Sequence, residues 1–342
     1  MNPSTTLAAQ QFRLRDYPSN AVNAHTWQLT HDEPTEPTVG QLLIRNRWLS
    51  VDPGMRGWIT PKRSYMPPVQ PGEVMRAFGV AEVLQSNAPG FQAGDTVTGF
   101  TGVQTVGLIP AQMVRKIDLR YASAQHYLSG LGMTGYTAYF GLIDVGQPQA
   151  GQTVVVSAAA GAVGSIVCQI AKIKGCKVVG IAGGPQKTQY LKETLGLDAV
   201  IDYKAGPIAS ALQAAAPEGI DLYFDNVGGE ILDAVLMHIN RHARIVICGG
   251  ISQYLDIEQV RGPANYLQLI AQSATMQGFT MRDYMNRIPE AFTALAGWHA
   301  KGEVQFRDHV LQGIASFPQA FEMLFKGANQ GKLLIQLTSE AA

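Results

Sequence analysis

The chain has 342 residues, 46% of them hydrophobic and 15% charged. That composition suits about two domains with cores of their own and argues against disorder. The 26 basic residues balance the 26 acidic ones, so charge gives no reason to expect a nucleic acid or an anionic membrane as partner.

The chain shows none of the patterns of a membrane or secreted protein. Residues 1–20 lack the apolar core of a signal peptide. No stretch reaches the roughly 18 apolar residues of a membrane span. The three cysteines have no paired spacing, which is typical of a reducing compartment. We therefore expect a cytoplasmic protein that binds neither nucleic acid nor membrane.

The first 125 or so residues predict mostly β-structure. Short apolar runs at 41–51, 79–86 and 95–100 are separated by Pro and Gly turns. The segment 60–72 is rich in proline, so it cannot form a central strand or a helix. It is either an exposed connector or a loop that covers a site.

From Thr153 onward, strand-like and helix-like segments alternate. The strands are nearly continuous apolar runs, as expected when helices cover both faces of a parallel sheet. Six strands with five intervening helices predict a doubly wound α/β nucleotide-binding domain. The expected strands cover 153–157, 177–182, 199–203, 221–227, 244–249 and 275–279. The expected helices cover 162–175, 185–196, 207–217, 229–240 and 263–273.

The remaining C-terminal part contains helical patterns at 289–304 and from 316, and it ends in a strand, KLLIQL. A helix and a strand after a complete six-stranded sheet are expected to return to the first domain. We therefore predict a discontinuous first domain, residues 1–125 and 305–342, and a nucleotide-binding domain, residues 126–304.

The stretch SAAAGAVGS, residues 157–165, follows a strand and opens a helix, which is the context of a dinucleotide fingerprint. Ala159 replaces the first glycine of G-x-G-x-x-G, and the other two glycines are present. The second lets a pyrophosphate approach the backbone, and the third lets the helix pack against its strand. A tight turn without a ligand is the alternative. The expected contacts are Ala160, Gly161, Ala162, Val163 and Gly164.

The end of the second strand favours NADPH over NADH. An NAD site needs Asp or Glu there to hold the ribose 2′-hydroxyl. Here the strand ends in Gly183 and Gly184, and Lys187 follows. Tyr203 and Lys204 end the third strand. A missing acid with a cation nearby favours a 2′-phosphate, although a solvated surface lysine is the usual alternative.

Glycine-rich turns follow the fourth and fifth strands, at DNVGG (225–229) and CGGISQY (248–254). Ligands bind at the carboxyl ends of strands in such sheets. Glycines there allow the nicotinamide ribose to lie against the backbone, and Asn226 can hydrogen-bond a ribose or a carboxamide. For the DNVGG turn, the alternative is that its glycines only begin the next helix.

Metal catalysis is not expected. A catalytic zinc needs Cys, His or carboxylate ligands. Residues 1–125 contain no cysteine and only His25 and His31, and three cysteines cannot form a four-cysteine site. His238 and His242 are four residues apart, but a strand is expected to begin just after His242, so they do not share a helix face.

Tyrosine is the remaining candidate to assist a hydride transfer, because a neutral phenol can donate a hydrogen bond or a proton. The candidates are Tyr65 in the proline-rich segment, Tyr254 after the fifth strand, and Tyr266. Each can instead be a half-buried packing residue. Tyr65 and Tyr254 are favoured because both are expected on loops that could meet at a cleft between the domains.

The chain as a whole resembles a known family. The segments VDPGMRGW (51–58), LGMTGYTAYFGL (131–142), SAAAGAVGS, FDNVGG (224–229) and GGISQY (249–254) are similar, in this order, to the medium-chain dehydrogenase/reductase superfamily. They are most similar to its zinc-independent branch of leukotriene/prostaglandin, alkenal double-bond and curcumin reductases. The resemblance implies a GroES-like catalytic domain, a Rossmann domain and a homodimer. It also implies reduction by NADPH of the C=C bond of α,β-unsaturated aldehydes and ketones.

The resemblance also implies roles for single residues. Lys187 and Tyr203 match positions that bind the 2′-phosphate, and Asn226 and Asn329 match positions near the nicotinamide. Tyr254 matches a cofactor residue and Tyr65 one that faces the substrate. The cofactor site is completed by Gly183, Val227, Cys248, Gly249 and Ile251, and the substrate site by Met55 and Arg56.

Two departures from the family pattern leave questions open. Gly54 stands where the family usually has an aromatic residue, which implies a wider or differently shaped pocket. A tyrosine of some mammalian relatives falls on Ala271, so the proton donor is either a tyrosine or water. An NADPH quinone oxidoreductase and a non-catalytic NADPH-binding sensor remain the alternative functions.

Overall fold

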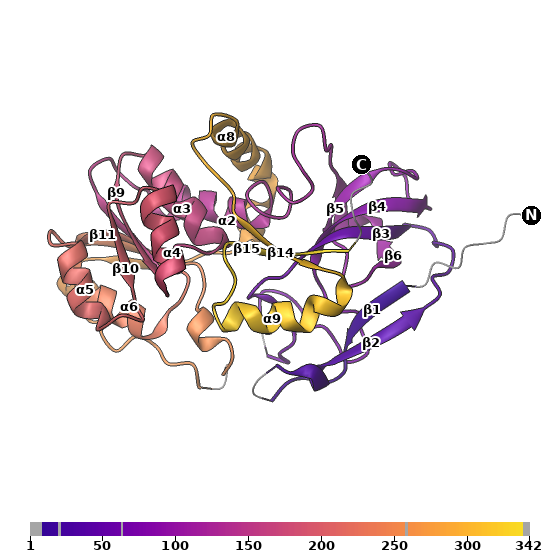
Figure 1. Cartoon of the computed structure of the whole chain (residues 1–342), viewed down its shortest axis with the longest axis horizontal. Coiled ribbons are helices and arrows are strands. Elements are labelled where there is room, and N and C mark those ends of the chain that lie inside the picture. Colours follow the sequence, from indigo (N-terminus) through magenta and orange to yellow (C-terminus); the bar gives the residue numbers. More distant parts are fainter. Residues whose placement is uncertain (1–8, 20–21, 63, 257–258, 338–342) are drawn as a thin grey trace, which may run out of the picture. The chain divides into compact units, whose positions relative to one another are not determined.

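The computed structural model describes residues 9–19, 22–62, 64–256 and 259–337. They form two compact units, whose elements are labelled in Figure 1. The first unit falls within Met1–Leu128, His309–Ala328 and Leu333–Ala342. The second comprises Ser129–Asp308 and Asn329–Lys332. Among the helices of these described residues, none has the length and the apolar character that crossing a bilayer requires.

The first unit is built on antiparallel strands. Its main sheet has the order β14-β15-β3-β4-β5-β7, with β6 paired to β3, and a separate ribbon joins β1 and β2. The pairs that connect β3, β4, β5, β6, β7 and β15 are antiparallel, as in a sheet with one solvated face. The strands are β1 (Ala9–Leu14), β2 (Trp27–Asp32), β3 (Gln41–Ser50), β4 (Phe78–Ser86), β5 (Thr96–Phe100), β6 (Val106–Pro110), β7 (Val114–Lys116), β14 (Asp308–Gln312) and β15 (Lys332–Gln336).

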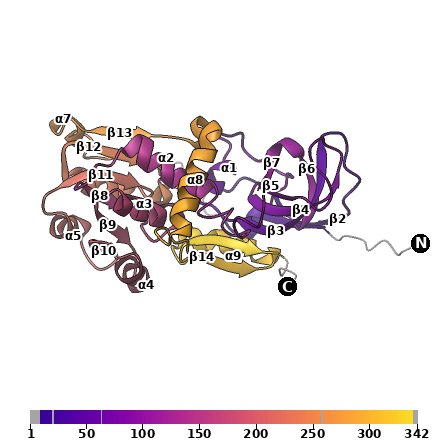
Figure 2. The same cartoon turned by 90° about the horizontal axis from the view of Figure 1, so that it is seen from above.

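The core of the first unit joins residues from both ends of the chain. Helix α9 (Phe317–Phe325) places Phe317 and Phe321 edge-on against Trp27, with ring centroids 5.0 Å and 5.6 Å apart. The four-residue helix α1 (Met55–Trp58) adds Met55 to the same core. The C-terminal segment therefore completes the first unit, as Figure 2 shows for α9 and β14.

The second unit contains a parallel six-stranded sheet of order β10-β9-β8-β11-β12-β13. This order confirms the doubly wound α/β prediction. The strands are β8 (Thr153–Val156), β9 (Lys177–Ala182), β10 (Ala199–Asp202), β11 (Ile220–Asp225), β12 (Ile239–Ile247) and β13 (Thr275–Gly278). The helices are α2 (Met133–Phe140), α3 (Ala162–Ile173), α4 (Pro185–Gln189), α5 (Ile208–Ala215), α6 (Gly229–Leu236), α7 (Gln268–Ala271) and α8 (Ile288–Ala300).

Helical segments cover both faces of this sheet. On one face, Val155 and Tyr223 belong to the same core as Leu212 of α5 and Leu232 of α6. On the other, a Cβ at Gly141 would lie 2.9 Å from the Phe224 ring, so the π-helical turn η3 (Gly141–Gly146) packs directly on the strands. Burial on both faces explains the continuous apolar runs of the sequence.

Several local features differ from the expectations. Strand β12 begins at Ile239, so His242 lies within the strand, with φ +65°, and not before it. Helix α7 has four residues, fewer than the expected 263–273. Strand β14 and the π-helical turn η3 had no clear sequence pattern. The helix expected at 185–196 is divided into α4 and the π-helical turn η4 (Tyr190–Thr194).

Candidate active site

The turn between β8 and α3 brings backbone very close to backbone. Ala158 has φ +46°, a left-handed conformation that few non-glycine residues adopt. A Cβ at Gly164 would lie 2.4 Å from the Ala158 carbonyl oxygen, and one at Gly161 would lie 3.0 Å from the same atom. Glycine at 164 therefore lets α3 start against its strand, which leaves the N–H groups of its first turn for an anion.

The segment 329–332 lies beside this turn. Gly331 forms a parallel bridge with Gly161. The Asn329 side chain donates to the Gly331 carbonyl oxygen over 2.8 Å, which fixes the segment locally. The structure thus places Asn329 next to the fingerprint turn, although the two are far apart in the sequence.

Lys187, Tyr203 and Lys204 gather at the carboxyl ends of β9 and β10. A Cβ at Gly183 would lie 2.6 Å from the Tyr203 ring, so only glycine lets this ring lie on the backbone there. The Lys204 ammonium stands 5.9 Å from the centroid of the Tyr203 ring. Burial lowers the pKa of Lys187, and the nearby positive charges of Lys204 and Arg307 lower it further. Clustered cations such as these are what a phosphate monoester needs.

Arg307 also belongs to this cluster, although no sequence pattern pointed to it. Its guanidinium carbon stands 4.3 Å from the centroid of the Tyr190 ring. It also donates a hydrogen bond to the Gln330 amide oxygen. Gln330 in turn donates to the Gln186 side chain over 2.6 Å, one residue before Lys187. The cation is thus held in place by an aromatic ring and an amide chain.

Asp202 is an acid near this cluster, at the end of β10 and not of β9. Its carboxylate accepts hydrogen bonds from the backbone N–H groups of Gly184 (3.0 Å) and Lys204 (2.9 Å). These bonds lower the pKa of Asp202. The carboxylate therefore ties the turn after β9 to the turn after β10 and is not the ribose-binding acid of an NAD site.

The ends of β8 and β11 are joined through Asn226. Its backbone N–H donates to the Ser157 hydroxyl (2.8 Å), and its side-chain amide donates to the Ser157 carbonyl oxygen (2.7 Å). One oxygen of the buried Asp225 accepts from Ser157, Tyr223, and the N–H groups of Val227 and Gly228. This network, which sequence reasoning missed, fixes the orientation of Asn226 at the strand ends.

Tyr254 is folded back on its own loop. Its hydroxyl oxygen accepts from the Gly250 N–H over 3.1 Å, and a Cβ at Gly249 would lie 3.2 Å from it. The loop is joined to the one after β11, since the Ile251 N–H donates to the Asn226 carbonyl oxygen over 3.2 Å. Burial raises the pKa of the neighbouring Cys248 to about 12, which keeps it a neutral thiol. Tyr266 is 55% exposed, in the turn before α7.

In the first unit, the expected substrate residues lie on and near α1. Met55 is fully buried and packs the core, and its sulfur accepts from the Asp52 N–H. Arg56 is 3% exposed and donates to the Thr60 hydroxyl over 2.7 Å. Tyr65 is 47% exposed, and its hydroxyl accepts from the indole of Trp58. Of the three, Tyr65 is the side chain that presents a polar group at the surface of its unit.

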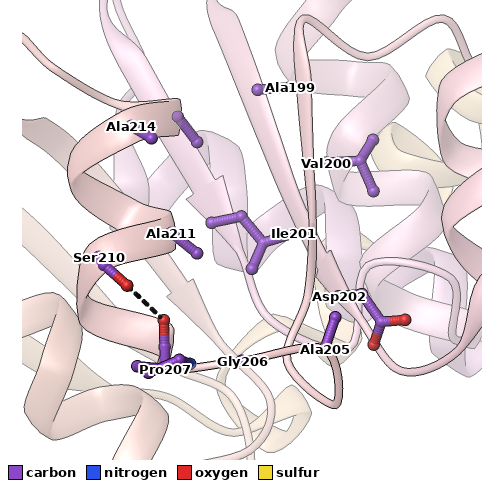
Figure 3. Close-up of a pocket in the computed structure, with 11 residues that line it drawn as sticks. Ala199, Val200, Ile201, Asp202, Ala205, Gly206, Pro207, Ser210, Ala211 and Ala214 are labelled. Atoms are coloured by element: carbon purple, nitrogen blue, oxygen red, sulfur yellow. Dashed lines mark hydrogen bonds between the residues drawn. The ribbon is translucent and has the colours of Figure 1, made fainter.

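Two further features of the described residues bear on the site. A groove of about 570 Å³ lies between β10 and α5 (Figure 3), lined mainly by small and aliphatic side chains. None of the expected cofactor residues lines it, although Asp202 and Ala205 of its lining flank Tyr203 and Lys204 in the sequence. Within the ranges that the structure describes, no three His, Cys, Asp or Glu side chains gather in a way that could hold a metal ion.

Comparisons with known proteins match this architecture. The family described as the N-terminal domain of oxidoreductase matches residues 10–117, and the one described as zinc-binding dehydrogenase matches 162–297. An NADPH-dependent curcumin reductase of Escherichia coli K12 is 40% identical over 332 residues, 96% of each chain. A 2-alkenal reductase (NADP(+)-dependent) of Nicotiana tabacum is 40% identical over 302 residues, 87% of this chain and 88% of its own. The crystal structure of CurA from Vibrio vulnificus in complex with NADPH has a TM-score of 0.91 at 40% identity, covering 97% of this chain and 100% of that one.

Proposed function

This chain belongs to the zinc-independent branch of the medium-chain dehydrogenase/reductase superfamily, and from that membership we propose its activity. It is an NADPH-dependent reductase of the C=C bond of α,β-unsaturated ketones and aldehydes. The observation that carries the choice of cofactor is the cluster of Lys187, Lys204 and Arg307 beside a strand end that lacks an acid.

The second unit offers residues suited to each part of NADPH. The first turn of α3 would hold the pyrophosphate, because Gly161 and Gly164 leave room there and the N–H groups of Ala162 and Val163 could donate. Lys187, Tyr203 and Arg307 would hold the 2′-phosphate. Asn226 and Asn329 would hold the nicotinamide half, with the loop 248–254 beside it.

Each part of the protein has a defined task in the reaction. When bound, the reduced nicotinamide supplies a hydride to the β-carbon of the substrate. Tyr65 donates a hydrogen bond to the carbonyl oxygen, where negative charge develops. The proton that completes the reduction comes from a tyrosine hydroxyl or from water. Tyr254 orders the loop against which the cofactor lies, because its hydroxyl holds the Gly250 N–H.

Turnover with a panel of acceptors tests this proposal. NADPH is mixed with the protein and either an aliphatic enone or a benzoquinone, and the products are identified by mass spectrometry. The expected product is the saturated ketone. Turnover with the quinone alone would assign the protein as a quinone oxidoreductase. Tight NADPH binding without turnover of either acceptor would leave a non-catalytic sensor.

We also propose that the protein works in the cytoplasm as a homodimer. The support for the dimer is the second unit, where β13 is an edge strand of the sheet. Large apolar side chains are exposed close to it in the sequence, among them Leu267 (58%), Ile270 (76%) and Met285 (53%). A monomer gains nothing from such a surface, whereas a second copy of the chain can cover it.

A further inference from the structure

The hydroxyl of Tyr65 has a partner within its own unit. The indole Nε1–H of Trp58 donates a hydrogen bond to the Tyr65 oxygen over 3.2 Å. Trp58 ends the short helix α1, and Tyr65 follows it in the proline-rich segment. An indole N–H only donates, so this contact fixes the Tyr65 oxygen as the acceptor.

Trp58 is a rigid donor. It is 5% exposed, and its ring meets the Phe100 ring edge-on with centroids 5.8 Å apart. Phe100 in turn stacks on Phe78, at 4.1 Å. Close packing therefore fixes the position of the indole N–H, and the hydrogen bond forms only when the Tyr65 hydroxyl lies next to it.

Arg76 links the Trp58 ring to the proline-rich segment that carries Tyr65. The Arg76 guanidinium carbon stands 5.7 Å from the centroid of the Trp58 ring, and the same side chain donates to the Pro67 carbonyl oxygen over 3.0 Å. Burial lowers the pKa of Arg76, while Glu73 and Tyr65 raise it. The segment around Tyr65 is thus anchored twice, at the tyrosine hydroxyl and at the backbone of Pro67.

Gly54 leaves space in front of this hydroxyl. Its φ is −59°, so the backbone would accept any residue. A Cβ built there would lie 3.4 Å from the Tyr65 oxygen, which is ordinary contact distance, so a longer side chain would press on the hydroxyl. Because position 54 has no side chain and Tyr65 is 47% exposed, a substrate atom can reach the hydroxyl.

We propose that Trp58 is a positioning residue that turns the Tyr65 hydroxyl into a hydrogen-bond donor for the substrate carbonyl oxygen. The contact with the indole uses a lone pair of the phenol oxygen and not its proton, so the same hydroxyl can also donate to a substrate oxygen that reaches it from the side of Gly54. Trp58 is buried, so in this proposal it acts through Tyr65 and not by touching the substrate. This inference rests on the proposed reduction of enones, and it adds the group that aims the donor.

A double-mutant cycle tests the coupling. Trp58→Phe keeps an aromatic ring for Phe100 and Arg76 and removes the N–H together with part of the ring system, a loss of volume that the Trp27→Phe control shares. Tyr65→Phe removes only the hydroxyl. Loss of one neutral hydrogen bond predicts that Trp58→Phe lowers kcat by about 2- to 10-fold with an unchanged KM for NADPH. In the Tyr65→Phe background, the same change is expected to have no further effect. Trp27→Phe is the matched control, because its buried indole nitrogen has no hydrogen-bond partner among the described residues.

A measurement without turnover tests the contact itself. The chain has four tryptophans, so a ¹⁵N-labelled sample gives four indole N–H signals in its NMR spectrum. Trp58→Phe identifies one of them by its loss. Tyr65→Phe is expected to shift that signal and to leave the signal of Trp27 in place.

The outcomes separate the inference from the function it rests on. A wild-type protein that reduces no enone contradicts the proposed function. A wild-type protein that reduces enones, with equal effects of Trp58→Phe in both backgrounds or none in the wild type, overturns only the role of Trp58. An unmoved indole signal in Tyr65→Phe overturns the role of Trp58 as well.

Discussion

Lys187 is the residue that distinguishes the two nicotinamide cofactors. Burial lowers its pKa, and the two neighbouring cations, Lys204 and Arg307, lower it further. An anion placed among these cations relieves their mutual repulsion. A phosphate on the ribose supplies that anion, and an unsubstituted ribose does not.

Replacing Lys187 or Arg307 is expected to weaken the binding of ligands that carry a 2′-phosphate and of no others. Lys187→Ala and Arg307→Gln should each lower the affinity for 2′,5′-ADP about ten- to a hundredfold, the loss of one charge-assisted contact, and leave 5′-AMP binding unchanged. Isothermal titration calorimetry measures both ligands. Lys192→Ala, an exposed lysine of η4, is the control and should change neither. Equal losses for the two ligands would contradict the assignment.

The sequence could propose Lys187 and Tyr203 as phosphate-binding residues because a strand end without an acid is visible locally. It could not predict Arg307, since only the fold brings residues 307 and 330 to Tyr190. Trp58 and Tyr65 are close in the sequence, but the hydrogen bond between them depends on side-chain rotamers, which hydrophobic periodicity does not predict. The Asp225 network was missed for the same reason, because its four donors come from two strand ends and one turn.

At the scale of elements, apolar runs predicted the six parallel strands well, because both faces of that sheet are buried. The elements that were missed have mixed composition. Strand β14 starts at the polar pair Asp308–His309, and the first residues of β12 include the polar Asn240 and Arg241. Pairing with a neighbouring strand stabilises such segments, and a pairing partner is not visible in a local window.

Asp308, the first residue of β14, makes stability depend on pH. Burial raises its pKa to about 6, while Ser129 and Lys332 lower it, and one of its oxygens is buried without a hydrogen-bond partner in the described structure. Unfolded Asp titrates near 3.9. Between these values the native state binds more protons than the unfolded state, so this group lowers the free energy of unfolding as the pH rises from about 4 to about 6.

Asp308→Asn is expected to remove this part of the pH dependence. A shift of about two pH units corresponds to at most about 3 kcal/mol, so the variant should gain 1 to 3 kcal/mol, roughly, over the wild type at pH 8 and little at pH 4. Urea unfolding at the two pH values measures the difference. A constant gap between variant and wild type across this range would show that the carboxyl does not titrate as described.

At the scale of the whole molecule, the chain order of strands and helices predicted the fold class, and the resemblance predicted the family. Both follow from patterns that extend over the full length. The return of one short segment to the second unit was not predicted. Residues 329–332 belong to that unit, and Gly331 forms a bridge with Gly161 there.

The proposed dimer is also a property of the whole molecule. Sedimentation should give twice the 36.8 kDa of one chain. Ile270→Glu is expected to shift that mass toward the monomer, and a wild-type mass of 36.8 kDa would contradict the dimer.

The central claim is the reduction of a C=C bond by NADPH, and the position of an isotope label tests it most directly. The protein is incubated with an aliphatic enone and NADPH deuterated at C4 of the nicotinamide, with each C4 epimer used in turn. The product is analysed by NMR. We expect a saturated ketone that carries one deuterium at the former β-carbon, from one of the two epimers. Deuterium at the carbonyl carbon, in an allylic alcohol, would contradict it, and so would an enone recovered unchanged.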